Sequence, residues 1–340
     1  MSDVTSIKSA KTSRATLKDV ADLAGVSQIS VSRVMRNAPN ISVSLRKKVN
    51  DAANALSYTP NRVAGALKNQ RANLIAVVLP SMGHDVFSPV RDGIEAALGP
   101  EGVNAVLGLS DYDPDRELKV IRELLSWSPK GIILTGLHHN ETIVGMITQL
   151  DVPVIQIMDI EGLPLGSAVG FSQTLAARTA ADYLFERGYR RIGYVGAWRE
   201  RPDRSKARRL AFEARLEELG APLVTSIIME ERSSAAVGSL ATSELLARHP
   251  EVDSIFFAND DLALGGLFHA ISAGIDVPNQ LGLLGFNGIE IGKATPITLS
   301  SIETPRYEMG FKAAELLLAV GNETQQIFDL GFKVFEGGST

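Results

Sequence analysis

Residues 16–37, with the sequence TLKDVADLAGVSQISVSRVMRN, constrain the fold most strongly because they predict two short helices around a tight turn. Thr16 is expected to cap the first helix, and Asp19 stands three residues later, where a capping box carries an acid. Gly25 allows the turn that follows. Apolar residues recur at helical spacing and predict a narrow buried stripe: Leu17, Val20, Ala21 and Ala24.

The second helix of this stretch is expected to start after Ser27 and to bury Val31 and Val34. Its other side carries short polar and basic residues: Gln28, Ser30, Ser32, Arg33 and Arg36. Such side chains on an exposed helical face can reach base edges and phosphates in the DNA major groove. The alternative is an ordinary helical hairpin with a solvated polar face.

The charge distribution favours the DNA interpretation. Residues 1–72 contain 12 Lys+Arg and 4 Asp+Glu, whereas the whole chain has a formal net charge of −5. A basic head therefore precedes an acidic body, and only the head suits a polyanion. Because neutralised phosphates release counterions, binding should weaken steeply with salt.

Residues 60–68, PNRVAGALK, predict a second short element. Pro60 ends the preceding helix, expected over 44–56, and Asn61 can cap a new one. Small apolar residues with one exposed leucine, Leu67, suit a wedge that enters the minor groove and unstacks a base step. The alternative for this segment is an ordinary linker helix.

The body of the chain alternates short apolar runs with amphipathic segments. The first set of runs covers 74–80, 104–109, 131–136 and 152–159, and a second set follows Gly170 at 191–197, 224–229, 253–260 and 281–287. Strands that alternate with helices predict parallel sheets wound in βαβ units. Two successive sets predict two similar lobes, with strand ends that face a shared ligand cleft.

Several classes of protein are disfavoured by what the sequence lacks. The chain has no Cys, which excludes disulfides, a thiol nucleophile and cysteine-bound zinc. The scattered histidines show no metal-ligand spacing, and no catalytic constellation or cofactor motif is present, so we expect a non-enzyme without metal or cofactor. Without a signal-like or membrane-length apolar run, we expect a cytoplasmic protein with no membrane partner.

The run 16–37, the following YTPNRVAGALK and the strand LIAVVLPS together resemble the lactose-repressor (LacI/GalR) family of bacterial transcription regulators. The resemblance covers essentially the whole chain from Thr16. It implies an α/β core of two lobes, each a doubly wound parallel sheet similar to that of periplasmic binding proteins, and an all-α N-terminal helix-turn-helix head. It also implies double-stranded operator DNA as a partner and a homodimer, with a tetramer possible.

The resemblance places domain boundaries and DNA contacts. We expect a flexible tail over 1–15, the DNA-binding domain over 16–60, a hinge helix over 61–72 and the effector-binding and dimerisation core over 73–340. Within the core we expect one lobe over about 73–172 plus 303–327 and the other over about 173–302 plus 328–340. The predicted DNA contacts are Thr16, Ser27, Gln28, Ile29, Ser30, Ser32, Arg33, Arg36, Asn61, Arg62, Ala64 and Leu67.

Arg208 is the first candidate for effector binding, because the family motif places a ligand-binding arginine at this position. A guanidinium early on the helix after strand 191–197 can bind a carboxylate or two hydroxyls, although a solvated arginine would fit the pattern too. Arg204 is a second candidate. Asn259 is expected to bind sugar hydroxyls, with Asp260 as the cap of the following helix. Asn287 stands where many relatives carry Asp, which would repel an anionic ligand.

The first lobe contributes further candidates. Ser81 and Phe87 resemble family pocket positions, as a polar contact and an aromatic wall, although Phe87 could equally be core. His138 and His139 follow a strand end and face different directions, so at most one lines the cleft, and His139 is the candidate. Asp159 ends another strand and could bind hydroxyls or satisfy a turn.

Within the family, the chain is most similar to repressors of gluconate utilisation, above all in the tail DLGFKVFEGGS. The resemblance implies a sugar-acid effector such as gluconate or a related aldonate or ketoaldonate. We expect this effector to act as an inducer that closes the lobes and releases the operator. The alternative is a regulator of the same family that answers to a neutral sugar or uses its ligand as corepressor.

Overall fold

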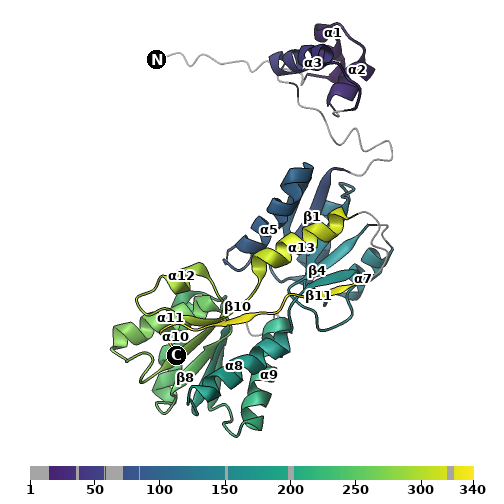
Figure 1. The fold of residues 1–340 in the computed structure, drawn as a ribbon. Coiled ribbons are helices and arrows are strands. Elements are labelled where there is room, and N and C mark those ends of the chain that lie inside the picture. The colour runs from purple at the N-terminus through teal and green to yellow at the C-terminus, as the bar shows by residue number, and fades with distance from the viewer. Residues whose placement is uncertain are drawn as a thin grey trace, which may run out of the picture. The chain divides into compact units, whose positions relative to one another are not determined.

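The computed structural model describes residues 15–35, 38–56, 58, 72–83, 85–149, 152–197, 203–319 and 325–340. The chain divides into two compact units, Met1–Gln70 and Arg71–Thr340, and each is described by itself. Figure 1 shows the fold and labels many of their helices and strands.

The described part of the first unit contains the helices α1 (Leu17–Ala24), α2 (Gln28–Met35) and α3 (Val43–Ala55). The predicted capping box is present, because Thr16 Oγ1 accepts from Asp19 N at 3.3 Å and Thr16 N donates to Asp19 Oδ2 at 2.7 Å. Gly25 ends α1 with φ 58°, the left-handed conformation that glycine favours. A small core of valines and alanines, with Val20, Val31 and Val49 fully buried, packs the helices together.

The second unit contains two six-stranded sheets. The first has the order β11-β5-β4-β3-β1-β2, and the second has the order β12-β10-β9-β8-β6-β7. All pairs are parallel except β10 with β12. The first sheet consists of β1 (Leu74–Leu79), β2 (Asn104–Leu109), β3 (Gly131–Thr135), β4 (Val154–Ile157), β5 (Ser167–Gly170) and β11 (Ile327–Asp329). The second consists of β6 (Ile192–Ala197), β7 (Thr225–Met229), β8 (Ser254–Phe257), β9 (Gly282–Asn287), β10 (Ser300–Glu303) and β12 (Lys333–Phe335).

Helices accompany both sheets and complete the two lobes (Figure 1). The first lobe contains α5 (Ser88–Leu98), the short 3-10 helix η1 (Gly99–Glu101), α6 (Pro114–Leu125), α7 (Glu141–Thr148) and α13 (Arg306–Leu318). The second contains α8 (Gln173–Glu186), α9 (Asp203–Glu218), α10 (Ala235–Arg248), α11 (Asp260–Ala273) and α12 (Glu290–Lys293). These two α/β lobes and the helical N-terminal unit confirm the predicted fold class.

The chain crosses between the lobes three times. Residues 171–172 join β5 to α8, residues 304–305 join β10 to α13, and residues 330–332 join β11 to β12. Because β11 pairs with β5, the strand Ile327–Asp329 belongs to the first sheet, close to the lobe boundary expected at about residue 327.

Glycines bring one pair of helices close together in each lobe. A Cβ added at Gly93 of α5 would lie 2.1 Å from the backbone oxygen of Tyr307, and one at Gly310 of α13 would lie 2.0 Å from that of Val90. In the second lobe, a Cβ at Gly265 of α11 would lie 2.0 Å from the backbone oxygen of Ala235. Backbone approaches backbone in both pairs, so no side-chain rotation can relieve an added methyl group.

We therefore predict that Gly310→Ala lowers the melting temperature, because overpacking two backbones costs about 1–3 kcal/mol. Gly145→Ala is the matched control, since a Cβ at this helical position has no neighbour within 4 Å. That control should stabilise the fold by up to about 1 kcal/mol through helix propensity. Thermal unfolding followed by circular dichroism measures both, and an equal response of the two variants would contradict the close packing.

Candidate functional site

The exposed face of α2 carries the residues predicted to read DNA. Gln28, Ile29 and Arg33 are exposed, and Ile29 is 74% exposed although its side chain is apolar. Ser27 Oγ accepts from Ser30 N at 3.1 Å, so Ser27 caps α2 as expected. An exposed β-branched side chain has little to gain in water, and apolar contact with thymine methyl groups is one known use for such a group.

The remaining predicted DNA contacts divide into two groups. Ser30 and Ser32 are half-buried on α2, and Thr16 is exposed at the start of α1. Five predicted contacts lie outside the residues that the structure describes: Arg36, Asn61, Arg62, Ala64 and Leu67.

A solvent-open cleft of about 800 Å³ lies between the two lobes of the second unit. Its lining includes Phe87 and Tyr112 from the first lobe and Ser233 from the second. Five of the predicted effector residues are brought together here: Phe87, Arg204, Arg208, Asn259 and Asn287. The cleft lies where carboxyl ends of both parallel sheets approach one another, the usual position for ligands in α/β folds.

Arg208 is the most unusual group in the cleft. Its Nη1 donates to Gln173 Oε1 at 2.6 Å and its Nη2 to the carbonyl of Ala258 at 3.2 Å, whereas its Nε is buried without a partner. The guanidinium lies 4.1 Å from the ring centroid of Phe286. Burial lowers the pKa of Arg208 to about 10, so the group still carries its charge at neutral pH. Among the described residues, no carboxylate forms an ion pair with it.

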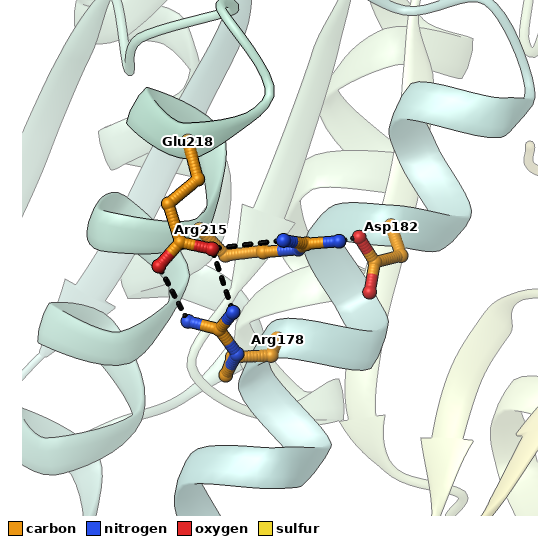
Figure 2. Close-up of polar contacts among 4 residues, drawn as sticks. All are labelled: Arg178, Asp182, Arg215 and Glu218. Atoms are coloured by element: carbon orange, nitrogen blue, oxygen red, sulfur yellow. Dashed lines mark hydrogen bonds and ion pairs between the residues drawn. The ribbon is translucent and has the colours of Figure 1, made fainter.

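Helix α9 is held in place by charged groups at its far end (Figure 2). Arg178 of α8 binds Glu218 of α9 through two hydrogen bonds, of 2.9 and 2.6 Å. Arg215 bridges Glu218 at 2.8 Å and Asp182 at 2.7 Å. Hydrogen bonds from Arg178 and then Arg215 lower the pKa of Glu218 to about 2. This network joins the C-terminal end of α9 to α8, at the end of α9 opposite to Arg204 and Arg208.

The expectation that Asp260 caps α11 is wrong, because Asn259 is the cap. Asn259 has an extended backbone (φ −160°, ψ 168°), and its Oδ1 accepts from Leu262 N at 3.1 Å. Its Nδ2 donates to Ser233 Oγ at 2.8 Å. Asp260 is already helical, and its carboxylate instead accepts from Ile289 N and Ser301 Oγ, each at 2.7 Å. Burial raises the pKa of Asp260 to about 6.

Phe87 and Asn287 line the cleft and are also held firmly by the surrounding structure. Phe87 is 2% exposed, so it belongs to the core and forms part of the cleft wall at once. Asn287 ends β9 with φ 111°, a strained conformation for a residue with a side chain. Strain of this kind persists only where the surrounding structure holds it, which makes the amide of Asn287 a fixed feature of the cleft.

The other three predicted effector residues are placed outside the cleft lining. Ser81 Oγ accepts from Gly83 N at 3.0 Å, and Asp159 accepts from Ile160 N at 2.8 Å and Glu161 N at 3.0 Å. Burial raises the pKa of Asp159. Each of these short side chains satisfies backbone donors of its own loop.

His139, the third of these residues, lies in the interior of the first lobe. Its side chain is fully buried, with Nδ1 3.1 Å from Glu117 Oε1 and Nε2 3.0 Å from Gln156 Nε2. Of the histidine pair, His138 lines a second pocket next to the cleft, which shares Tyr112 and Arg204 with it. The sequence could not show which of His138 and His139 faces a pocket, because both follow the end of the same strand.

Tyr112 and Gln173 are among the cleft residues that were missed from sequence. Tyr112 follows the carboxyl end of β2, so the strand-end rule that selected Asp159 could have found it. Gln173, in the ordinary sequence FSQT, carries no signal of its own, and only the tertiary structure places it beside Arg208.

The described residues contain no group of His, Cys, Asp and Glu that could hold a metal ion. Among the described helices, none is long and apolar enough to cross a membrane.

Comparison with known proteins identifies both units. Residues 16–61 match the model of bacterial regulatory proteins of the lacI family. Residues 72–330 match the model of periplasmic binding proteins and the sugar-binding domain of the LacI family. The chain belongs to the LacI family. It is a DNA-binding transcriptional regulator, as the sequence predicted.

Individual LacI-family relatives cover almost the whole chain. The HTH-type transcriptional regulator GntR of Pseudomonas aeruginosa is 38% identical over 97% of this chain and 96% of its own length. GntR of Escherichia coli K12 is 36% identical over 97% of this chain and 99% of its own length. A LacI-family regulator from Silicibacter pomeroyi has a similar crystal structure, with a TM-score of 0.90 and 37% identity over 96% of this chain and 99% of that one. The relatives named here are regulators and not enzymes.

We predict that Ile29→Ala weakens operator binding about tenfold, because each methylene group lost from an apolar base contact costs about 0.8 kcal/mol. The melting temperature should stay unchanged, since the side chain is exposed. Fluorescence anisotropy with operator DNA measures the affinity, and Leu163→Ala, at a 92% exposed site in the second unit, is the control. Unchanged affinity would remove Ile29 from the DNA interface.

We also predict a pH-dependent stability that is specific to Asp260. Its folded pKa of about 6 exceeds the ordinary 3.8, so the folded state binds the proton more tightly than the unfolded state. The carboxyl group therefore lowers stability progressively as pH rises from 4 to 6, by about 3 kcal/mol in total.

Asp260→Asn removes the titration, while its amide can still accept from Ile289 N and donate to Ser301 Oγ. Urea unfolding from pH 4 to 7.5 should show the variant gaining stability relative to the parent protein as pH rises. A difference that does not change with pH would contradict the raised pKa.

Proposed function

We propose that this regulator is a repressor that leaves its operator when a sugar acid, such as gluconate or a related aldonate or ketoaldonate, enters the cleft. The observation that supports this most directly is Arg208, whose guanidinium lines the cleft with its Nε buried and, among the described residues, with no carboxylate partner. A buried charge is costly unless it is paired, so the site favours a ligand that supplies a negative group.

The geometry of Arg208 suits a carboxylate better than a hydroxyl. Its Nε–H has no partner among the described residues, and each terminal nitrogen carries a second proton beyond the bonds to Gln173 and Ala258. Two neighbouring N–H groups of a guanidinium match the two oxygens of a carboxylate. A hydroxyl could accept one such bond but could not neutralise the charge.

The rest of the cleft suits the polyol part of a sugar acid. Asn259 and Asn287 offer amide groups that both donate and accept, and Phe87 offers an apolar wall. Arg204 lies one helical turn before Arg208 and adds a second positive charge. We assign these residues to effector binding, and no metal or catalytic role is needed.

The resemblance to repressors of gluconate utilisation supports the same class of effector. Two relatives that carry the name GntR match the chain over nearly its full length. The regulator named IdnR from Escherichia coli K12 is also similar, at 29% identity. Small pocket changes alter specificity in this kind of fold, so the effector itself has to be measured.

The exposed face of α2 suits the major groove of an operator. We propose a homodimer whose two heads occupy successive major grooves of a near-palindromic site, as helix-turn-helix dimers do. Binding of effector and of operator must then oppose one another reciprocally, since linkage acts equally in both directions.

The test is fluorescence anisotropy of the protein on DNA from its own upstream region, titrated with D-gluconate, other sugar acids and neutral sugars. We expect D-gluconate to lower operator affinity and neutral sugars to have no effect. Tighter binding with gluconate would reverse the sign and make the ligand a corepressor. A response to a neutral sugar alone would overturn the sugar-acid assignment.

Arg208→Gln should abolish the response to gluconate while operator binding without ligand persists. Arg209→Gln is the matched control, because Arg209 is the next residue of α9 but pairs with Glu213. Loss of the response in both variants would indicate a general disturbance of α9. A full response in Arg208→Gln would remove Arg208 from the effector site.

A further inference from the structure

One buried side chain, that of Gln173, connects Arg208 to the opposite lobe. Its Oε1 accepts from Arg208 Nη1 at 2.6 Å, and its Nε2 donates to the carbonyl of Met158 at 2.6 Å. Arg208 belongs to α9 of the second lobe, whereas Met158 follows β4 of the first. Gln173 is 2% exposed, so water does not compete for either bond.

The two partners of Gln173 demand a side-chain amide. A guanidinium can only donate hydrogen bonds, and a backbone carbonyl can only accept them. The bridging side chain must therefore accept at one end and donate at the other, which fixes the orientation of the amide. A glutamate would keep the acceptor and lose the donor, and a methionine of similar size would lose both strong interactions.

The bridge lies among the segments where the chain crosses between the lobes. Gln173 directly follows the first crossover at 171–172. The ring of Phe286, on which Arg208 rests, has its centroid 6.2 Å from that of Phe171 in this crossover. Phe171 in turn contacts Phe332 of the third crossover, at 6.3 Å. A displacement of Arg208 would therefore act directly on the side chains around which the lobes would turn.

The carbonyl that accepts from Gln173 belongs to Met158, whose backbone conformation is strained. Its φ of 79° is in the left-handed region, which residues with a side chain rarely adopt. Without the bond from Gln173, its buried carbonyl would lose a partner, and the arrangement of the lobes that brings the two groups together would be less favoured.

We propose that Gln173 is the positioning residue that transmits effector binding at Arg208 to the relative arrangement of the two lobes. This inference rests on the proposed function, because it assigns a regulatory consequence to the same cleft. When an anion binds the free N–H groups of Arg208, the guanidinium reorients, and Gln173 conveys this change to the backbone of Met158. The effector thereby shifts the equilibrium between lobe arrangements by its different affinity for each.

The absence of cysteine from the chain makes the lobe arrangement measurable. Leu163→Cys in the first lobe and Leu240→Cys in the second introduce two unique labelling sites, at positions 92% and 59% exposed. Doubly labelled chains, diluted with an excess of unlabelled chain, then report the distance between lobes of one chain by resonance energy transfer.

Without any ligand, Gln173→Met should lower the transfer efficiency, because the arrangement with both bonds is less populated. Arg208→Met should do the same, and the double variant should show no more than the larger single change. Such non-additivity is expected when two residues act through one another.

Gln156→Met is the matched control for loss of a buried amide. Gln156 is fully buried and bonds Gly136 O at 2.9 Å and Leu165 N at 2.5 Å, all within the first lobe. It should lower the melting temperature without changing the transfer efficiency. The proposal is overturned if Gln173→Met leaves the transfer efficiency unchanged, or if Gln156→Met changes it equally.

D-gluconate provides a second, separable measurement. If gluconate releases operator from the parent protein, Gln173→Met should reduce the ratio of operator Kd values with and without gluconate at least fivefold. Gln173→Glu should bind gluconate more weakly, because its carboxylate pairs with Arg208, and should still show the lowered transfer efficiency. An undiminished operator response in Gln173→Met would overturn the role of Gln173. If gluconate has no effect on the parent protein, the proposed effector fails, and the ligand-free energy transfer still decides the bridge.

Discussion

Three crossovers between two lobes limit how the ligand-binding unit can move. Residues 171–172, 304–305 and 330–332 all pass between the sheets, so the lobes can turn about this region but cannot separate. The cleft lies beside it, and the rings of Phe171 and Phe332 pack against each other from two of the crossovers. Arg306, at the second crossover, adds hydrogen bonds to the carbonyls of Asp85 at 3.1 Å and Gly288 at 2.9 Å. The proposed ligand contacts and any turning of the lobes would therefore involve the same few residues.

The charge of Arg208 is the main electrostatic cost of this arrangement. The fold offsets it with two acceptors and an aromatic face, and although burial lowers its pKa to about 10, the guanidinium stays protonated at neutral pH. The chain as a whole is acidic outside its basic first 72 residues. Operator phosphates are therefore attracted by the head and repelled by the body, while the proposed anionic effector would meet a local positive site inside the body. Under this proposal, positive charge serves two different anionic partners at separate places.

Local signals allowed much of this structure to be predicted from sequence. The capping box at Thr16, the turn at Gly25 and the alternation of strands and helices all depend on residues that are near one another in the chain. The sequence could not show which of two neighbouring residues takes a role when tertiary contacts decide it. Asn259 and not Asp260 caps α11, because Asp260 is drawn to Ile289 and Ser301. His139 turns inward to Glu117 and Gln156, and Gln173 has no sequence pattern that distinguishes it. Strand ends thus predicted where the cleft lies better than which side chains enter it.

The free energy expected for coupling between effector and operator is similar to the free energy that the two hydrogen bonds of Gln173 contribute. Coupling free energies between two sites are typically about 1–3 kcal/mol, which changes affinity about 5- to 150-fold. One buried hydrogen bond to a charged group contributes about 1.5–3 kcal/mol and a neutral one about 1 kcal/mol. Gln173 makes one of each, to Arg208 and to Met158. A bridge of two bonds is thus strong enough to favour one lobe arrangement, and weak enough for a carboxylate bound at the remaining N–H groups of Arg208 to shift the preference.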